Sequence, residues 1–375
     1  MKRIGIITIL KVNNYGAELQ AYALQAILKK LGYDVEIIDY LFYKNKGHRI
    51  TKRSKPLFKF SYKKKISEII YPIITKLKEF KLGRCNRRIE RFEQFHQKYT
   101  SLTRSFVTIE DLYSDCPIYD VYISGSDQIW NPGIYSSIKP YFLDFAYLGK
   151  RRIAYASSFG VESLPHDTHS FYREMLSKFD AIGVREKSGV KIINSLGLNA
   201  KNVLDPTLLL NREDWQLVSE TTIEVPSKYV LVYEITPSTY INSVALEISN
   251  QLQLPIVRIC RSASKEDKGS INVIDAGPSE FIALMLNATM VITNSFHGTA
   301  FAINFQKPFF VVAPKRKDNN CRQIDLLNLF DLSDRILQEG DSVPTGIEID
   351  YLKVSSKLEK ERKDSLDFLI NAING

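Results

Sequence analysis

The sequence predicts an α/β protein made of two parallel-sheet domains that face each other across a cleft, with a basic helical insertion in the first domain. Apolar segments of strand length alternate with segments of helical periodicity in two separate series along the chain. A length of 375 residues suits two domains of ordinary size better than one. The mean hydropathy of −0.16 is that of a soluble globular protein.

The N-terminal 39 residues predict a βαβ unit. Residues 3–10 form an apolar run that we interpret as a buried strand, followed by a helix over residues 17–31 and a strand over residues 35–39. The first run is short and lacks a small-residue cleavage site, which argues against a signal peptide. No stretch approaches the roughly 20 apolar residues that span a bilayer, so we expect a cytoplasmic protein.

The alternation continues through two domains. We expect a first domain over residues 1–210, a second over residues 211–350, and a C-terminal helix, residues 351–375, that crosses back over the first domain. The expected strands of the first domain are residues 119–123, 152–156, 181–184 and 202–204; those of the second are residues 229–234, 256–260, 271–274, 290–293 and 309–312. Ligands of such sheets bind at the carboxyl ends of the strands, which predicts a site in the cleft.

Residues 44–106 interrupt this pattern and carry most of the positive charge. They contain nineteen Lys and Arg against four Asp and Glu, a net charge of +15, so the rest of a chain with net charge +9 carries −6. Apolar residues at helical spacing beside lysines predict a basic amphipathic helix. Either this insertion packs on its own domain, or it contacts anionic lipid at the inner face of the membrane or a diphosphate-linked acceptor. No motif supports nucleic-acid binding.

The cysteines and histidines do not predict a metal site. Four cysteines are scattered without paired spacing, and none of the five histidines is spaced as a ligand. We therefore expect neither a metal nor a cofactor.

The densest signal for chemistry lies at residues 293–302 (TNSFHGTAFA), where a buried strand ends in a polar turn and a helix of small residues begins. Asn294 or Ser295 is positioned to cap that helix, whose first N–H groups suit an anion. His297 then lies at a strand end, where it is either a packed residue or a catalyst.

Five motifs occur in order along the chain: residues 14–20 (NYGAELQ), 125–131 (GSDQIWN), 184–188 (VREKS), 205–207 (DPT) and 294–299 (NSFHGT), with 277–280 (GPSE) ahead of the last. On this ordered set the chain resembles the polysaccharide pyruvyltransferase family over nearly its whole length, apart from the insertion. The resemblance implies a two-domain fold like that of GT-B glycosyltransferases and phosphoenolpyruvate as the donor substrate.

The resemblance also implies catalytic residues. The histidine of the family's strand-end motif matches His297, the arginine of its Val-Arg motif matches Arg185, and a lysine after the next strand matches Lys317, with Lys315 close enough to compete. Many relatives have arginine two residues before the histidine, where this chain has Ser295. That change removes a bidentate cation, and the basic run at residues 315–317 is the candidate to replace its charge.

Several further residues are candidates for substrate binding, each with a purely structural alternative. The turn before the first helix would bind phosphate or sugar, or would only connect the strand to the helix. Asp127 would orient an acceptor hydroxyl, or would only cap a turn. Glu280 would contact the acceptor, or serve as a first-turn helix acid. The full set is Asn14, Tyr15, Gly16, Ser126, Asp127, Gln128, Glu280, Asn294, Ser295 and Lys315.

These observations predict transfer of the enolpyruvyl group of phosphoenolpyruvate onto a sugar of a cell-surface polysaccharide precursor, as a pyruvate ketal. The acceptor is a saccharide, free or lipid-linked. A sugar-nucleotide-dependent glycosyltransferase of the same fold and a non-catalytic sugar-binding protein are the alternatives.

Overall fold

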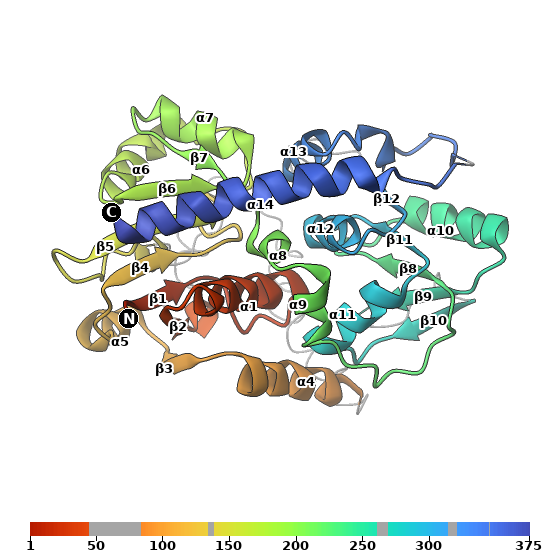
Figure 1. Cartoon of the computed structure of the whole chain (residues 1–375), viewed down its shortest axis with the longest axis horizontal. Helices are drawn as coiled ribbons and strands as arrows, with labels where there is room; N and C mark the ends of the chain where they lie inside the picture. The colour runs from red at the N-terminus through yellow and green to blue at the C-terminus, as the bar shows by residue number, and fades with distance from the viewer. Residues whose placement is uncertain (45–83, 134–138, 261–268, 314–320, 345) are drawn as a thin grey trace, which may run out of the picture.

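The computed structural model describes residues 1–44, 84–133, 139–260, 269–313, 321–344 and 346–375. They form two α/β units, each built on one parallel sheet, and Figure 1 shows the two units side by side along the long axis.

The first unit contains a seven-stranded sheet in the order β3-β2-β1-β4-β5-β6-β7, with all neighbouring strands parallel. Its strands are β1 (Arg3–Ile7), β2 (Asp34–Tyr40), β3 (Leu102–Phe106), β4 (Val121–Ser124), β5 (Arg151–Ser157), β6 (Ala181–Val184) and β7 (Lys201–Asn202). Its helices are α1 (Tyr15–Lys30), α4 (Arg84–Tyr99), α5 (Ile109–Asp115), α6 (His169–Leu176) and α7 (Lys187–Ser195). The central strands β1 and β4 are apolar runs because helices cover both of their faces.

The second unit contains a six-stranded parallel sheet in the order β10-β9-β8-β11-β12-β13. Its strands are β8 (Val230–Tyr233), β9 (Ile256–Ile259), β10 (Ser270–Val273), β11 (Met290–Thr293), β12 (Phe309–Val312) and β13 (Ile336–Leu337). Its helices are α10 (Thr239–Leu252), α11 (Pro278–Asn287), α12 (Phe296–Asn304) and α13 (Cys321–Leu329).

Both sheets have the strand order of Rossmann-like domains, which confirms the predicted fold class. In each sheet the order reverses beside the first strand of the unit, between β1 and β4 and between β8 and β11. These reversals are the positions where such sheets bind ligands, at the carboxyl ends of the strands.

One strand differs from expectation. Residues 102–106 were assigned to the helical insertion, yet they form β3, the edge strand that pairs with β2. Only two of these five residues are apolar and the middle of the strand is exposed, so the apolar pattern of a buried strand is missing. The expected basic helix around residues 66–80 lies outside the described residues.

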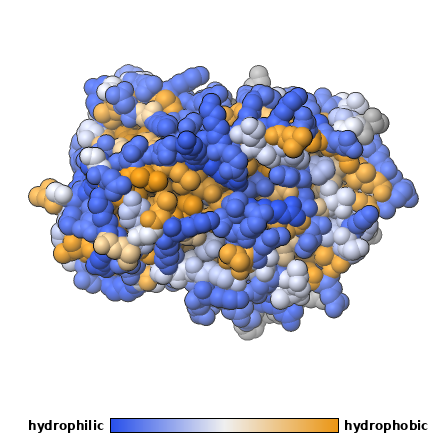
Figure 2. Space-filling view, in the orientation of Figure 1, coloured by the Kyte–Doolittle hydropathy of each residue, from blue (hydrophilic) through white to orange (hydrophobic). Residues whose placement is uncertain are grey.

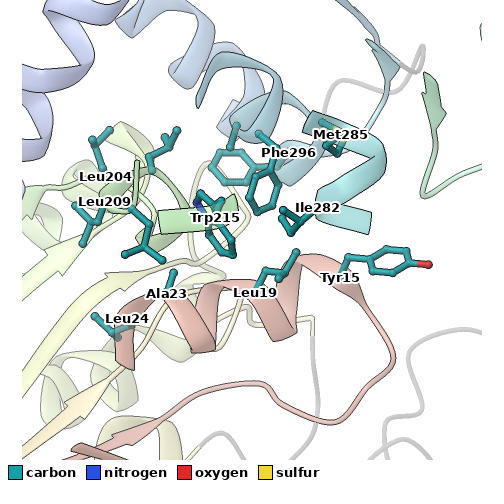
Figure 3. Close-up of a cluster of buried hydrophobic side chains, with 14 of the residues drawn as sticks. Tyr15, Leu19, Ala23, Leu24, Leu204, Leu209, Trp215, Ile282, Met285 and Phe296 are labelled. Atoms are coloured by element: carbon teal, nitrogen blue, oxygen red, sulfur yellow. The ribbon is translucent and has the colours of Figure 1, made fainter. Parts of the chain in front are cut away.

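The segment between the two units is part of the core. It contains α8 (Pro206–Leu209) and α9 (Arg212–Gln216), and Trp215 of α9 is fully buried. Figure 3 shows Trp215 between Leu19 of α1 and a group of side chains from the second unit that includes Ile282 and Phe296. One hydrophobic cluster therefore runs through both units and holds them together.

The C-terminal helix α14 (Tyr351–Asn374) runs along both units (Figure 1). Val354, Leu358, Leu369 and Ile373 are buried on one side of it, while the outward side is largely hydrophilic in Figure 2. Its end returns to the first unit, where Lys2 Nζ donates to the Ile373 carbonyl at 2.8 Å. Among the described helices, none is long and apolar enough to cross a membrane.

Candidate active site

His297 lies at the start of α12, directly after β11. Ser295 is the N-cap residue, and its side-chain oxygen accepts a hydrogen bond from the Gly298 amide at 3.3 Å. The Ser295 amide in turn donates to the Thr293 hydroxyl at 3.0 Å. These bonds fix the turn that places His297 at the carboxyl edge of the second sheet, with 6% of the residue exposed.

Asn294, the other candidate cap, has a different role. Its side chain accepts from the Ile235 amide at 2.8 Å and donates to the Thr236 carbonyl at 2.7 Å. It therefore holds the loop after β8 against the turn after β11.

Arg185 lies at the carboxyl end of β6, and its side chain is only 1% exposed. Nη1 donates to Asp205 Oδ2 at 2.8 Å, and the guanidinium carbon lies 4.4 Å from the centre of the Phe296 ring. Nε and Nη2 are buried and have no hydrogen-bond partner among the described residues. Nη2 lies 3.6 Å from Asp127 Oδ1, and Nε lies 4.0 Å from Glu186 Oε2.

Asp205 connects the two units. It is the N-cap of α8, and Oδ1 accepts from the amide and the hydroxyl of Thr207 at 3.0 and 2.7 Å. Oδ2 accepts from Ser126 Oγ and from Arg185 Nη1, each at 2.8 Å. The same oxygen lies 3.6 Å from Nε2 of His297, a buried atom that has no hydrogen-bond partner in the part of the chain that the structure describes.

The surrounding charges keep Asp205 ionised. Burial alone would raise the pKa of its carboxyl, but His297 and Arg185 together lower that pKa well below its ordinary value. Burial alone would lower the pKa of the Arg185 guanidinium, whereas the carboxylates of Asp205, Asp127 and Glu186 raise it above its ordinary value. The cluster is therefore a buried carboxylate that holds a cation and faces an imidazole.

The turn before α1 brings the first unit against His297. Asn14 Oδ1 accepts from the amides of Gly16 and Ala17 at 2.9 and 3.4 Å, which caps the helix. A Cβ atom on Gly16 would lie 2.0 Å from Nδ1 of His297, so only glycine fits there.

The amides of this turn are used by the protein itself. The buried carboxylate of Glu18 accepts from the amides of Lys11 and Val12 at 3.1 and 3.0 Å. Lys11 and Asn13 adopt positive φ angles of 55° and 53° around this carboxylate. These two amides, like those of Gly16 and Ala17, are therefore already bonded within the protein, and binding of phosphate or sugar by the turn stays a prediction.

Tyr15 joins the two units. Its hydroxyl donates to the Ala276 carbonyl at 2.8 Å, and its ring stacks on Phe281 at 4.5 Å between ring centres. Burial raises the pKa of its hydroxyl above the ordinary value. With 2% of the residue exposed, Tyr15 serves the domain interface, and substrate binding by it stays a prediction.

The predicted motif after β4 contributes Ser126 and Asp127 to the cluster. Asp127 adopts a φ of 74°, and its side-chain oxygen accepts from the amide of the next residue, Gln128, at 2.8 Å. Gln128 lies 2.7 Å from Asn131 through their side-chain amides and so contacts its own loop. The structure thus brings Ser126, Asp127, Arg185 and His297 together around Asp205.

Glu280 has a structural role. One of its oxygens accepts from the Gly277 amide at 3.0 Å, and the other binds Arg91 Nε at 3.0 Å and the Thr222 hydroxyl at 2.8 Å. It is the first-turn acid of α11 and ties that helix to α4, which is one of the two interpretations offered by the sequence. A contact between Glu280 and the acceptor stays a prediction.

The two predicted lysines, Lys315 and Lys317, lie outside the described residues.

Two buried carboxylates beside Arg185 are not among the residues predicted to bind substrate. Asp205 lies in the motif at residues 205–207, where an aspartate directly before a proline is a recognisable helix cap. Glu186 is buried and accepts from Ser158 Oγ, the Phe159 amide and the Gly160 amide at 2.9, 2.8 and 3.2 Å. It supports the loop behind Arg185, and its position directly after that arginine was the only signal. The described part of the chain contains no group of three or more His, Cys, Asp or Glu that could hold a metal ion.

Comparison with known proteins identifies a family. A family model described as polysaccharide pyruvyl transferase matches residues 14–316 of the chain. The matched region contains every residue of the cluster around Asp205. A search of curated proteins gives no match.

Solved structures with a similar fold include sugar-nucleotide enzymes. A putative UDP-N-acetylglucosamine 2-epimerase from Listeria monocytogenes is 10% identical, with 98% of this chain and 88% of that chain covered and a TM-score of 0.49. The UDP-GlcNAc 2-epimerase from Methanocaldococcus jannaschii is 10% identical, with 96% and 92% covered and a TM-score of 0.48. The LPS heptosyltransferase II from E. coli is 11% identical, with 97% and 99% covered and a TM-score of 0.38. Similarities this low carry no information on the reaction.

Proposed function

The chain belongs to the polysaccharide pyruvyl transferase family, and we propose that it transfers the pyruvyl unit of phosphoenolpyruvate to a sugar as a ketal. The observation that best supports this proposal is the buried cluster of Arg185, Asp205 and His297, which combines a guanidinium that has unused donors with an imidazole. The guanidinium can bind an anionic donor, and the imidazole can transfer protons.

The proposed reaction moves two protons. The methylene carbon of phosphoenolpyruvate takes up a proton, and its C2 becomes an oxocarbenium-like centre that one sugar hydroxyl attacks. The C2–O bond to phosphate then breaks, and a second hydroxyl closes the ketal. One hydroxyl proton replaces the proton given to the methylene, and the other leaves with inorganic phosphate. We assign proton donation and acceptance to His297, for a rate factor of about 10²–10⁴.

Arg185 is proposed to bind the carboxylate or the phosphate of the donor through Nε and Nη2, the two nitrogens that have no hydrogen-bond partner among residues the structure describes. Three carboxylates, those of Asp205, Asp127 and Glu186, lie within 4.0 Å of its guanidinium. The described cluster alone therefore cannot neutralise a donor with several negative charges. We propose that Lys315 and Lys317 supply the additional charge, with Lys317 offsetting charge on the departing phosphate.

The reaction is tested by phosphate release from phosphoenolpyruvate with galactosides, glucosides and N-acetylmannosaminides as acceptors. Wild type is compared with His297→Ala and Arg185→Ala, with His166→Ala at an exposed histidine as the control. We expect acceptor-dependent release that the first two substitutions abolish and the control retains. Absence of phosphoenolpyruvate binding by calorimetry would overturn the donor assignment, and sugar nucleotides would then be tested for glycosyl transfer.

The saccharide acceptor is proposed to be lipid-linked, since residues 44–106 carry a net charge of +15 that suits an anionic membrane surface. We expect the protein to sediment with anionic liposomes, and we expect salt or neutralisation of Lys63, Lys64 and Lys65 to weaken that binding. Binding unaffected by either change would contradict this part of the proposal.

A further inference from the structure

The two ring nitrogens of His297 have different surroundings. Nε2 is buried, forms no hydrogen bond with any described residue and lies 3.6 Å from Asp205 Oδ2. The side chain is 8% exposed, and that exposure does not include Nε2. Nδ1 lies on the opposite side of the ring and packs against the backbone at Gly16.

Asp205 determines whether Nε2 of His297 carries a proton. An ionised carboxylate only accepts hydrogen bonds, and Oδ2 already accepts from Ser126 and Arg185. If Nε2 presented its lone pair, two acceptors would face each other in a buried site. If Nε2 carries a proton, the contact is favourable, and a separation of 3.6 Å is typical of catalytic pairs that shorten when substrate binds.

We propose that Asp205 is a positioning residue that holds the proton of neutral His297 on Nε2, so that Nδ1 is the nitrogen that exchanges protons with the substrates. The chemical part of this proposal rests on the proposed function, whereas the proton position does not. The imidazolium gives its Nδ1 proton to the methylene of the donor, which leaves neutral His297 with its remaining proton on Nε2. Nδ1 then accepts the proton of the attacking sugar hydroxyl, which restores an imidazolium that Asp205 stabilises. The carboxylate of Asp205 stays ionised throughout.

Neighbouring groups support this orientation of the ring. Thr207 donates to Oδ1 of Asp205 twice, and Ser126 and Arg185 donate to Oδ2, so the carboxylate cannot rotate without losing partners. Gly16 places backbone rather than a side chain against the ring at Nδ1. The carboxylate and the helix α1 therefore fix the ring from two sides.

The test is a long-range ¹H–¹⁵N correlation spectrum of the full chain labelled with ¹⁵N-histidine, recorded at a pH where His297 is neutral. The chain has five histidines, and loss of one signal set in His297→Gln assigns the residue. Protonated and unprotonated ring nitrogens resonate in separate ranges. We expect Nε2 to be protonated and Nδ1 unprotonated. Protonation on Nδ1 in the wild-type protein would overturn the proposal, whether or not any variant folds.

Two isosteric variants test the role of Asp205. In Asp205→Asn we expect a loss of preference for the Nε2–H form and a fall in kcat on the order of 10²-fold, with a smaller change in KM for phosphoenolpyruvate. Asp127→Asn removes a charge near Arg185 but not one facing Nε2, so we expect the wild-type proton position there. An unchanged proton position in Asp205→Asn would contradict the assignment. Because the spectrum needs no substrate, failure of the proposed reaction alone would leave the proton position intact.

Discussion

The backbone of Gly16, in the first unit, packs against the imidazole of His297, in the second. A Cβ at residue 16 would lie 2.0 Å from Nδ1 and 2.6 Å from each of the two neighbouring ring carbons. The start of α1 therefore fixes the position of His297, the proposed acid and base. The turn before α1 and the turn before α12 thus belong to one site.

Gly16→Ala is expected to displace the His297 ring. Phosphate release should fall by about 10- to 100-fold, and overpacking should cost about 1–3 kcal/mol of the free energy of unfolding. The control is Gly346→Ala, where no atom of the described residues lies within 4 Å of the added carbon. Phosphate release and thermal unfolding are measured for both variants. Wild-type values of both in Gly16→Ala would contradict the close approach of residue 16 to the His297 ring.

The units are also joined by a buried polar group centred on Arg362 of α14. Nε donates to the Leu208 carbonyl at 2.6 Å, and Nη2 donates to Asn304 Oδ1 at 2.7 Å and to the Leu210 carbonyl at 3.3 Å. Asn304 itself donates to the carbonyls of Thr207 and Leu210, each at 2.9 Å. The end of α12, the connecting segment and α14 are thereby held together.

Arg362→Ala is expected to lower the free energy of unfolding by about 2–5 kcal/mol, because buried acceptors lose their donor at roughly 1–3 kcal/mol each. Lys360→Ala, at an exposed position of the same helix, should change it by less than about 0.5 kcal/mol. Denaturant unfolding of both variants measures the difference. Equal stabilities would show that these bonds do not hold the units together.

The lowered pKa of Asp205 predicts a pH dependence of stability. A carboxyl whose pKa is lower in the folded than in the unfolded state stabilises the fold above the unfolded value, near 3.8, and loses that contribution as the pH falls toward the folded value. The stability difference between wild type and Asp205→Asn should therefore shrink as the pH falls below about 4. Urea unfolding at a series of pH values measures it, and a difference that grows on acidification would be contrary to expectation.

Lys307, which precedes β12, should be unusually reactive. Partial burial, reinforced by the charge of Arg212, lowers the pKa of its amine to about 8. Only the neutral amine reacts with acylating reagents, so its labelling should rise with a midpoint near pH 8. Peptide mass spectrometry across pH values, with exposed Lys360 as the reference, measures this. A midpoint above pH 10 would show that burial does not act on this amine.

The sequence predicts most strands because parallel strands covered on both faces are continuous apolar runs, as in β4 and β11. The edge strand β3 lacks that pattern and lies beside basic residues, so periodicity does not reveal it. His297 was predictable from its position at a strand end, and Arg185 from the resemblance of its motif to the family. The contacts of Asp205 could not be predicted, because only the folded chain shows that Ser126, Arg185 and His297 converge on one of its oxygens.

The most direct test of the proposed reaction follows the methylene carbon of the donor and the proton that it takes up. Phosphoenolpyruvate labelled with ¹³C at the methylene carbon is incubated in D₂O with an acceptor that supports phosphate release. We expect an acceptor-bound methyl group with the ¹³C label and one deuterium for each phosphate released, and we expect this product to be lost in His297→Ala. Phosphate release without label on the acceptor, or label transfer that persists in His297→Ala, would contradict this expectation.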